Sequence, residues 1–400
     1  MATQIYLEWA VIGLMWAHIV AILGWVGSSL YFMWLDSKLR LPEPARENVL
    51  GEAWMGHGGG FYIVEKRHIA PGKVPYPLHW FRVEAAVTWF TGFLLLVAVY
   101  YWGGGVRLVD PATSIIGPKA AIVLAVGLLP VSWFAYDRIW TSDLSDSNPG
   151  IANVISFALL FLLVLVLCRV FNGRAAYIHV GAVMGTNMVA NVWTRIIPAQ
   201  EEAVAATRAG RERNARLAGW AKRRAAHNTY LTLPVIMTMI ANHTPSIYGH
   251  RLNWLLLALL IVIGVAARHV MIMFDRRESA SWRWASAVGP LAASIVVIGM
   301  LSVSPLAPAS SEAAVSFPIV HGIVILRCTS CHSQKPADRA FVTAPDGVAF
   351  DSAAQIQANA AMIRAVVGSR TMPPGNSTGM TDEERSLISR WGGHDGQLAR

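Results

Sequence analysis

The chain has 400 residues, of which 54% are hydrophobic and only 14% are charged. Soluble domains contain about a quarter charged residues, so this composition excludes an ordinary soluble enzyme and indicates a membrane protein with a modest polar part. The formal net charge is +9. The basic residues cluster between apolar stretches, as membrane topology produces, and we therefore exclude nucleic-acid binding.

Eight apolar stretches are each about 20 residues or longer, enough to cross a hydrocarbon core of about 30 Å. They cover roughly 7–34, 79–102, 115–137, 150–172, 175–197, 227–247, 251–274 and 284–304. We predict an all-α chain in which an eight-helix transmembrane bundle fills residues 1–304. A linker rich in Pro, Ala and Ser follows over 305–316, and a small α-helical domain over 317–400.

The loops between these stretches predict the orientation, because loops on the cytoplasmic side are enriched in Lys and Arg. The first, fifth and seventh loops are basic, and they carry Lys38, Arg40, Arg46, Lys66, Arg67 and Lys73, then Arg208, Arg211, Arg213, Arg216, Lys222, Arg223 and Arg224, then Arg276, Arg277 and Arg283. The even-numbered loops hold little more than Arg107, Arg174 and Arg251. The chain should therefore span the bilayer repeatedly, with both termini on the outer side.

A polar stripe lies within the fifth apolar stretch. Asn187, Asn191 and Arg195 are spaced four residues apart, so each step advances only about 40° around a helix. Two amides and a guanidinium suit the binding of a flat, anionic, hydrogen-bonding heterocycle. Interhelical hydrogen bonds, with Arg195 extending to the inner surface, are the alternative.

Histidines within the spans form two candidate groups. His18, His179 and His243 should lie toward the outer side, where they could ligate a non-covalent b-type haem, act as a relay or make structural hydrogen bonds. No adjacent His-His pair occurs, which argues against an oxygen-reducing haem–copper centre. Near the inner side, His79 and Glu84 are candidates for proton transfer, although an ion pair between Glu84 and Arg82 would explain that carboxylate equally well.

The first loop is long and contains Gly56-His57-Gly58-Gly59-Gly60 followed by Phe61-Tyr62. Its glycines permit positive φ and close backbone approach. It is no phosphate-binding loop, because no Gly-Lys-Ser/Thr follows. The sequence is compatible with two interpretations of this loop: a functional loop that closes over a pocket, or a flexible connector.

The last 85 or so residues carry the most specific motif, Cys328-Thr329-Ser330-Cys331-His332. A C-x-x-C-H run is the signature of covalent haem c, with both cysteines in thioether bonds and the histidine under the iron. A zinc site would need two more soft ligands, and the only other cysteine is Cys168 in an apolar span. A thioredoxin-like pair would need a βαβ context, which is absent.

The sixth iron ligand should come from Thr371-Met372-Pro373-Pro374-Gly375, because the prolines stiffen a loop that presents Met372. Met362 and Met380 are the competitors. Helices are predicted over 317–327, ahead of the haem motif, and after the capping box that runs from Thr381 to Glu384. A His/Met haem leaves no open coordination site and serves as an electron carrier.

Together these features resemble the bacterial membrane-bound urate oxidases, also called urate hydroxylases. The resemblance rests on the eight-helix membrane part, Gly56–Tyr62, Leu78-His79-Trp80-Phe81 followed by Glu84, and the C-terminal haem motif, and it spans nearly the full length. It implies oxidation of urate to 5-hydroxyisourate in purine degradation, without hydrogen peroxide. It further implies a bacterial inner-membrane location, a periplasmic cytochrome c domain over 317–400 and one covalent haem c. Electrons would leave through that haem to an acceptor such as a soluble cytochrome c or a terminal oxidase.

Two other functions remain open from the sequence. One is a membrane-anchored electron-transfer cytochrome, although an anchor needs one helix rather than eight with buried polar residues. The other is a quinol-oxidising subunit of a respiratory complex, in which the membrane histidines hold b haem.

Overall fold

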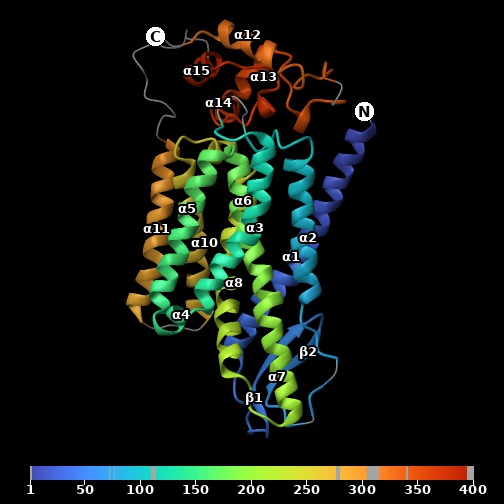
Figure 1. Ribbon diagram of the computed structural model, residues 1–400, viewed down its shortest axis with the longest axis vertical. Coiled ribbons are helices and arrows are strands. Elements are labelled where there is room, and N and C mark those ends of the chain that lie inside the picture. Colours follow the sequence, from blue (N-terminus) through green and yellow to red (C-terminus); the bar gives the residue numbers. More distant parts are fainter. Residues whose placement is uncertain are drawn as a thin grey trace.

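The computed structural model describes residues 2–71, 73–75, 77–109, 114–275, 280–303, 315–338 and 341–393. A bundle of long, nearly parallel helices forms most of the molecule (Figure 1). A group of short helices, the C-terminal domain (residues 315–393), lies over one end of the bundle, which we call the domain end. The opposite end carries a β-hairpin and α7, and we call it the hairpin end. The N-terminal end of α1 lies at the domain end.

The long helices of the bundle follow the predicted apolar stretches. They are α1 (Ala2–Lys38), α2 (Arg82–Leu96) with the π-helical turn η1 (Val97–Tyr101), α3 (Pro118–Thr141), α5 (Pro149–Val170), α6 (Gly173–Asn191), α8 (Ala215–Ala241), α10 (Asn253–Asp275) and α11 (Ser281–Val303). The short helices α4 (Asp143–Ser147) and α9 (Pro245–Tyr248) lie between them. Among the described residues, six helices are long and apolar enough to cross a membrane: α1, α2 with η1, α3, α5, α10 and α11. The polar side chains of α6 and α8 set these two helices apart.

Two of the predicted boundaries differ from the structure. The helix predicted to end at residue 197 continues through the π-helical turn η2 (Val192–Ile196) into α7 (Ile197–Ala209). Pro198 lies at the junction and lacks the N–H that would bond a carbonyl one turn earlier, which accounts for the widened turn. The next helix begins at Ala215 rather than 227, because the Asn214 side chain caps it by accepting from the N–H groups of Arg216 and Leu217.

The expectation of an all-α chain needs one correction, since the first loop is a β-hairpin. Strands β1 (Val49–His57) and β2 (Gly60–Arg67) pair antiparallel, with His57 opposite Gly60. Gly58 and Gly59 form the two-residue turn with φ of 59° and 80°. Positive φ at both positions is what a tight hairpin turn requires, and glycine adopts it without strain. The Gly-Gly pair is therefore a turn signal rather than a source of flexibility.

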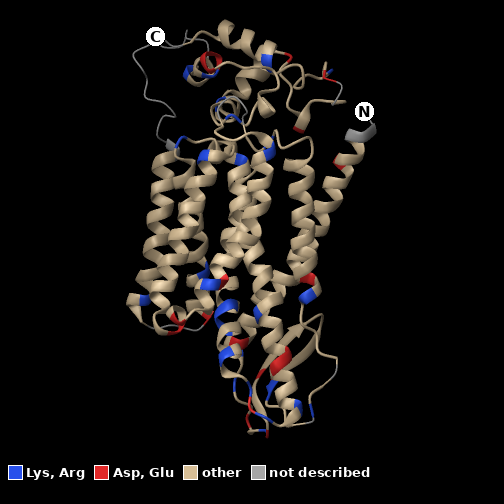
Figure 2. Cartoon of the chain, in the orientation of Figure 1, with Lys and Arg blue, Asp and Glu red and all other residues tan. Residues whose placement is uncertain are grey.

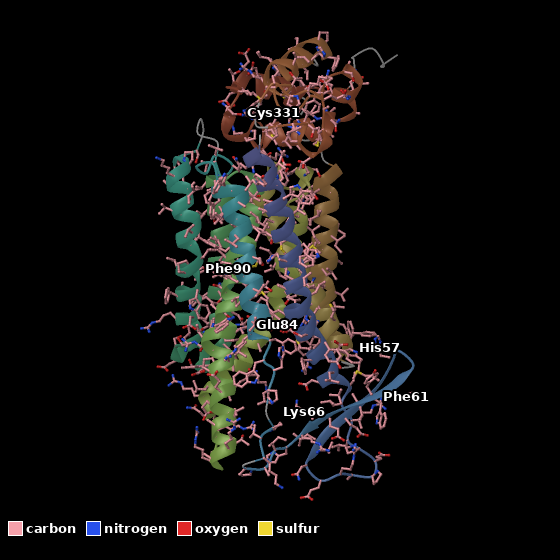
Figure 3. The ribbon with its side chains drawn as sticks, turned by 90° about the vertical axis from the view of Figure 1, so that its right-hand side faces the viewer. His57, Phe61, Lys66, Glu84, Phe90 and Cys331 are labelled. Atoms are coloured by element: carbon pink, nitrogen blue, oxygen red, sulfur yellow. The ribbon has the colours of Figure 1, made fainter. Side chains whose placement is uncertain are left out.

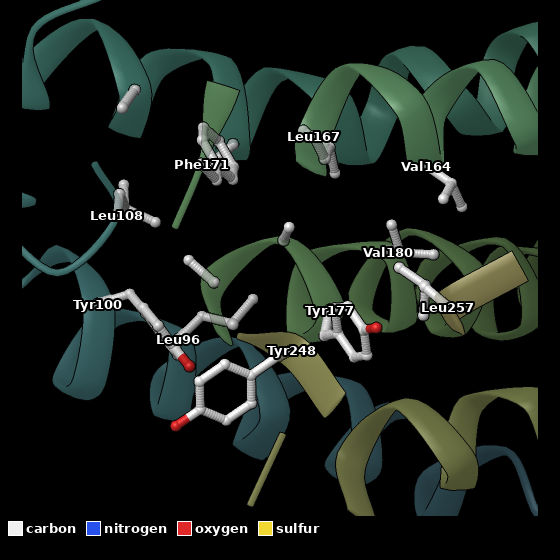
Figure 4. Close-up of a cluster of buried hydrophobic side chains, with 14 of the residues drawn as sticks. Leu96, Tyr100, Leu108, Val164, Leu167, Phe171, Tyr177, Val180, Tyr248 and Leu257 are labelled. Carbon is white, nitrogen blue, oxygen red and sulfur yellow. The ribbon is translucent and has the colours of Figure 1, made fainter. Parts of the chain in front are cut away.

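The largest apolar cluster of the bundle lies between α2, α3, α5, α6 and α10, toward the domain end (Figure 4). Tyr177 and Leu167 are fully buried there, and Cys168 packs against the cluster. Helices α10 and α8 approach closely at Gly264 of α10, where an added Cβ would lie 2.6 Å from the backbone N of Pro234 in α8. Small residues at such contacts allow backbones to pack tightly in membrane proteins.

The C-terminal domain has a hydrophobic core of its own, around Val320, Ile356, Ile388 and Trp391. It consists of α12 (Phe317–Arg327), η3 (Pro345–Gly347), α13 (Ala353–Ala358), α14 (Ala360–Gly368), η4 (Pro374–Asn376) and α15 (Asp382–Arg390). The predicted capping box is confirmed, because Thr381 and Glu384 exchange side chain to backbone hydrogen bonds at the start of α15. Of the predicted linker, residues 305–314 lie outside the described residues, and Val315 is already part of this core.

The C-terminal domain rests directly on the bundle at two points. A Cβ added at Gly249, after α9, would lie 2.6 Å from the carbonyl oxygen of Ala365 in α14. A Cβ added at Gly375 would lie 2.8 Å from the Cβ of Val106, which follows η1. Gly375 belongs to the loop that carries Met372, so this loop contacts the bundle.

Candidate functional site

The Cys-x-x-Cys-His segment forms a single helical turn at the end of α12. The N–H of Cys331 donates to the carbonyl of Cys328 at 3.2 Å, and the N–H of His332 donates to the same carbonyl at 2.8 Å. Burial raises the pKa of the Cys328 thiol to about 12. Both cysteines and the histidine are therefore held within a single short turn of the backbone.

The orientation of His332 suits an iron ligand. Its Nδ1 lies 2.8 Å from the carbonyl oxygen of Val348 and must donate to it, which leaves Nε2 free. Histidines that bind metals characteristically donate their other ring N–H to a carbonyl or carboxylate. The ring of Phe350 lies beside the imidazole at 5.3 Å between centroids. These residues therefore fit the haem that the motif implies.

A buried arginine fixes the loop that carries Met372. Arg385 of α15 donates to the carbonyl oxygens of Met372 and Val367, both at 2.9 Å, and to Asn376 Oδ1 at 3.1 Å. Met380, one of the competing methionines, is 3% exposed and belongs to the core of the domain. Its side chain is therefore engaged in packing, whereas Met372 is only partly buried.

A second polar group lies in the bundle toward the hairpin end, between α3, η2 and α8. The predicted stripe does face one neighbour, because each of its residues contacts α3. Asn187 accepts from the Ser132 hydroxyl at 3.3 Å, and Asn191 donates to the Tyr136 hydroxyl at 3.3 Å. Arg195 donates through Nε to Asp137 at 2.9 Å and through Nη2 to the other oxygen of the same carboxylate.

Asp137 also holds a second cation. Arg224 of α8 donates through Nη2 to Asp137 Oδ1 at 2.7 Å, and its guanidinium lies 4.5 Å from the centroid of the Tyr136 ring. The Arg224 side chain is 1% exposed, that of Asp137 15% and that of Arg195 27%. Two guanidinium groups thus share one carboxylate, and the cluster keeps a net positive charge in a largely buried place.

Hydrogen bonds continue from this cluster to α6 and α8. Asn191 donates to Asn228 Oδ1 at 2.8 Å, and the Tyr136 hydroxyl lies 2.6 Å from Nδ1 of His227. Despite this network, several buried atoms have no hydrogen-bond partner: Nε and Nη1 of Arg224 and Oδ1 of Asn191. We call Asn191, Arg195, Arg224, Tyr136 and Asp137 the Asp137 cluster.

His79 and Glu84 form a separate pair. The Nε2 atom of His79 lies 3.0 Å from Glu84 Oε1, while Arg82 lies 3.9 Å from Glu201 and not beside Glu84. The ion pair between Glu84 and Arg82 that the sequence left open is therefore replaced by the pair with His79. Figure 3 shows Glu84 inside the bundle near the hairpin end. The second oxygen of this carboxylate is buried without a partner.

This pair does not join the stripe. Val192 and Ile197 pack on Ala85 with Trp25 and Trp80 around them, whereas the stripe contacts α3. No hydrogen bond or ion pair among the described residues links His79 or Glu84 to Asn191 or Arg195. The structure thus brings the five predicted residues to one end of the bundle, but in two groups.

The three histidines expected toward the outer side differ in their hydrogen bonding and exposure. Both ring nitrogens of His179 are occupied, by the Tyr101 hydroxyl at 3.0 Å and the Ala175 carbonyl at 2.7 Å. His18 Nδ1 lies 2.9 Å from the Thr88 carbonyl and 3.0 Å from the Thr91 hydroxyl. His243 is exposed. In this conformation His179 has no nitrogen free for iron.

Sequence reasoning missed the residues that complete the Asp137 cluster. Asp137 stood at the predicted end of a span, and Arg224 was counted among the basic residues of a loop. Asp137 is the sole acidic residue of α3, and an ionisable residue inside an apolar span is a functional signal by itself. That signal could have found it.

A family model described as "Urate oxidase N-terminal" matches residues 4–301, which covers the whole bundle with its hairpin. No curated protein and no solved structure matches the chain.

Proposed function

The chain belongs to the urate oxidase N-terminal family, and on this premise we propose that it oxidises urate to 5-hydroxyisourate. Electrons pass to a covalent haem c in the C-terminal domain and onward to an acceptor such as a soluble cytochrome c or a terminal oxidase. Oxygen is not the direct oxidant, and no hydrogen peroxide forms. The observation that carries this proposal is the union, in one chain, of the matched membrane part with a haem-attachment turn whose histidine is oriented for iron.

The residues that would hold the haem are Cys328 and Cys331, through thioether bonds, and His332 and Met372, as the ligands of its iron. When bound there, a haem c accepts one electron at a time. With His332 and Met372 both committed to holding the group, this part of the chain would offer no place for urate. The substrate must therefore bind elsewhere, and the bundle supplies the buried polar groups.

The reaction balances without oxygen as a reactant. Urate and water give 5-hydroxyisourate, two protons and two electrons, and the electrons leave in two one-electron steps. The bundle residues then have to bind a planar anion, exclude bulk water and accept protons. We assign binding to the stripe of Asn187, Asn191 and Arg195 in the Asp137 cluster region, and proton transfer to the pair of His79 and Glu84.

The proposed setting is the bacterial inner membrane, spanned eight times, with both termini and the C-terminal domain in the periplasm. In support, charged residues gather at the hairpin end, in the hairpin, α7 and the start of α8, while the helices between the two ends carry few of them (Figure 2). An excess of Lys and Arg marks the cytoplasmic side. The domain end then faces outward, where haem c is attached.

Reduction of the haem by urate tests the proposal. The full-length protein, matured in cells that attach haem c, should show its ferrous absorption bands when urate is added without oxygen, and 5-hydroxyisourate should form at one molecule per two electrons. In air, turnover with a soluble cytochrome c should give no peroxide. A haem that stays oxidised with urate but is reduced by quinol, together with b haem in the pyridine haemochrome spectrum, would establish the quinol-oxidising function instead.

A further inference from the structure

The unpaired atoms of the Asp137 cluster indicate what the cluster binds. Arg224 is 0% exposed, yet only its Nη2 makes hydrogen bonds, to the side chain and the carbonyl of Asp137. The Nε–H and both N–H bonds of Nη1 have no acceptor. Buried donors on a charged group are costly when left unpaired, and such atoms in a native structure usually have a partner.

The net charge of the cluster also indicates a missing ligand. Arg195 and Arg224 share the single carboxylate of Asp137, so one positive charge is uncompensated. A buried charge needs a counter-charge, because desolvation of a lone ion costs several kcal/mol. An anionic ligand supplies both the missing charge and the missing acceptors.

The cluster also contains an unpaired acceptor. Asn191 is 0% exposed, and its Nδ2 donates to Tyr136 and Asn228, while its Oδ1 has no donor. Both Arg224 and Asn191 contact Tyr136, one over the ring and the other at the hydroxyl. The unpaired donors and the unpaired acceptor therefore flank the same aromatic side chain.

We propose that Arg224 and Asn191 form the subsite for the anionic oxopurine substrate. The Arg224 N–H groups donate to its oxygen or deprotonated ring nitrogen, and Asn191 Oδ1 accepts from one of its ring N–H groups. This inference rests on the proposed function and deepens it, since it adds Arg224 to the binding residues of the stripe, in which Arg195 also holds Asp137. A planar ligand with acceptors and donors on its edge matches a guanidinium and an amide.

A second buried arginine serves as the comparison. Arg268 of α10 is 2% exposed and donates only to sulfur atoms, to Met33 at 3.1 Å and Met271 at 3.9 Å. Its Nε also has no partner. Around Arg268 there is no unpaired amide oxygen of the kind that Asn191 provides, among the described residues with buried unpaired atoms. A comparison of variants at Arg224 and Arg268 can therefore distinguish a role in substrate recognition from the general effect of removing a buried cation.

Urate binding to the pre-reduced, haem-loaded full-length protein tests the proposal, because a reduced haem prevents turnover during equilibrium dialysis with labelled urate. Arg224→Gln should weaken binding about 10-fold to 100-fold, as loss of hydrogen bonds to a charged group does. Arg268→Gln should change it less than about threefold. Unchanged affinity in Arg224→Gln, or an equal loss in Arg268→Gln, overturns the assignment.

A second variant, Asn191→Asp, keeps the test decisive if Arg224→Gln fails to fold. The aspartate has the same shape and adds a negative charge beside Arg224, so the cluster stays compensated while an anion is repelled. We expect binding at least about 10-fold weaker with an unchanged haem spectrum, and native affinity would refute the subsite. If the unmodified protein binds no urate and its haem is not reduced by urate, the proposed function itself fails.

Discussion

The Asp137 cluster predicts a large loss of stability when its carboxylate is neutralised. Asp137→Asn keeps the shape of the side chain but strands two guanidinium groups, of which Arg224 is wholly buried. Breaking a buried ion pair by removing one partner costs about 3–5 kcal/mol. Because the Arg195 side chain is still 27% exposed, we expect a loss of about 3 kcal/mol, near the lower end of that range.

The measurement is the unfolding of detergent-solubilised protein by increasing mole fractions of SDS, followed by tryptophan fluorescence. Asp143→Asn is the matched control, since its carboxylate is fully exposed and lies 3.9 Å from Arg216. An exposed pair of this kind contributes about 0–1 kcal/mol. Adding Arg195→Gln to Asp137→Asn removes one stranded cation and should recover about 1 kcal/mol. Equal effects of the two aspartate variants would refute the assignment of a buried, shared counter-ion.

Three further predictions concern the C-terminal domain. Burial by itself raises the pKa of Glu384, but the Thr381 N–H and the Arg327 guanidinium lower it more, so its stabilisation is present above the unfolded pKa of about 4.3 and is lost as pH falls through the folded value. Glu384→Gln should therefore cost about 1–2 kcal/mol at pH 7 in thermal unfolding and little at pH 3, and an equal cost at both values would contradict this. Met372→Ala should lower the haem midpoint potential in redox titration, whereas Met380→Ala should lower stability with an unchanged potential; the reverse pattern would exchange their roles. Cys331→Ala should reduce the haem that stays on the chain in denaturing gels, and full retention would argue against a thioether at this residue.

The sequence-based predictions that the structure confirms rest on patterns of residues that are close together in the sequence. The capping box at Thr381 and Glu384 needs only four consecutive residues, and its geometry appears as expected. Six helices among the described residues are long and apolar enough to cross a bilayer, as their runs of apolar residues predict. The facing of Asn187, Asn191 and Arg195 onto α3 follows from helical spacing, and the helix period alone is enough to predict a shared face.

What depends on contacts between distant segments could not be predicted in the same way. The partner of Arg195 is Asp137, 58 positions away, and the partner of Asp137 on α8 is Arg224, 87 positions away. Nothing local to Arg224 distinguishes it from the exposed arginines before it. Burial distinguishes it, and burial is set by how α3, η2 and α8 pack. The hairpin was missed for another reason, since Gly58-Gly59 was considered only as part of a pocket-closing loop or a flexible connector, although it is also a turn signal.

The distance between the two centres constrains how they can cooperate. From Pro118, near the domain end, α3 rises about 28 Å to Asp137 at about 1.5 Å per residue. Figure 3 likewise shows Cys331 in the C-terminal domain and Glu84 in the half of the bundle nearer the hairpin. Electrons taken from a substrate at the Asp137 cluster would therefore have to cross most of the bundle before they reach the C-terminal domain.

Aromatic side chains divide this distance into shorter parts. The ring of Trp133 lies 6.0 Å from that of Tyr136, and Trp89 stacks on Phe93 at 5.4 Å. Ser132, beside Trp133, bonds Asn187 of α6, and Trp89 bonds the adjacent Thr186, so both tryptophans lie at the same height of α6.

Above Trp89, α2 continues to Tyr101 in η1, whose hydroxyl contacts His179. Val106 then follows, packed against Gly375 of the loop that carries Met372. A histidine that accepts a hydrogen bond from a phenol can take up its proton, so the positive charge left when Tyr101 loses an electron would lie on the His179 imidazole rather than on the phenol. The occupied nitrogens of His179 thus weaken its candidacy as a ligand of b haem but suit the other role considered from the sequence, a relay. The contact between Val106 and Gly375 makes the end of η1 the place where such a path would leave the bundle.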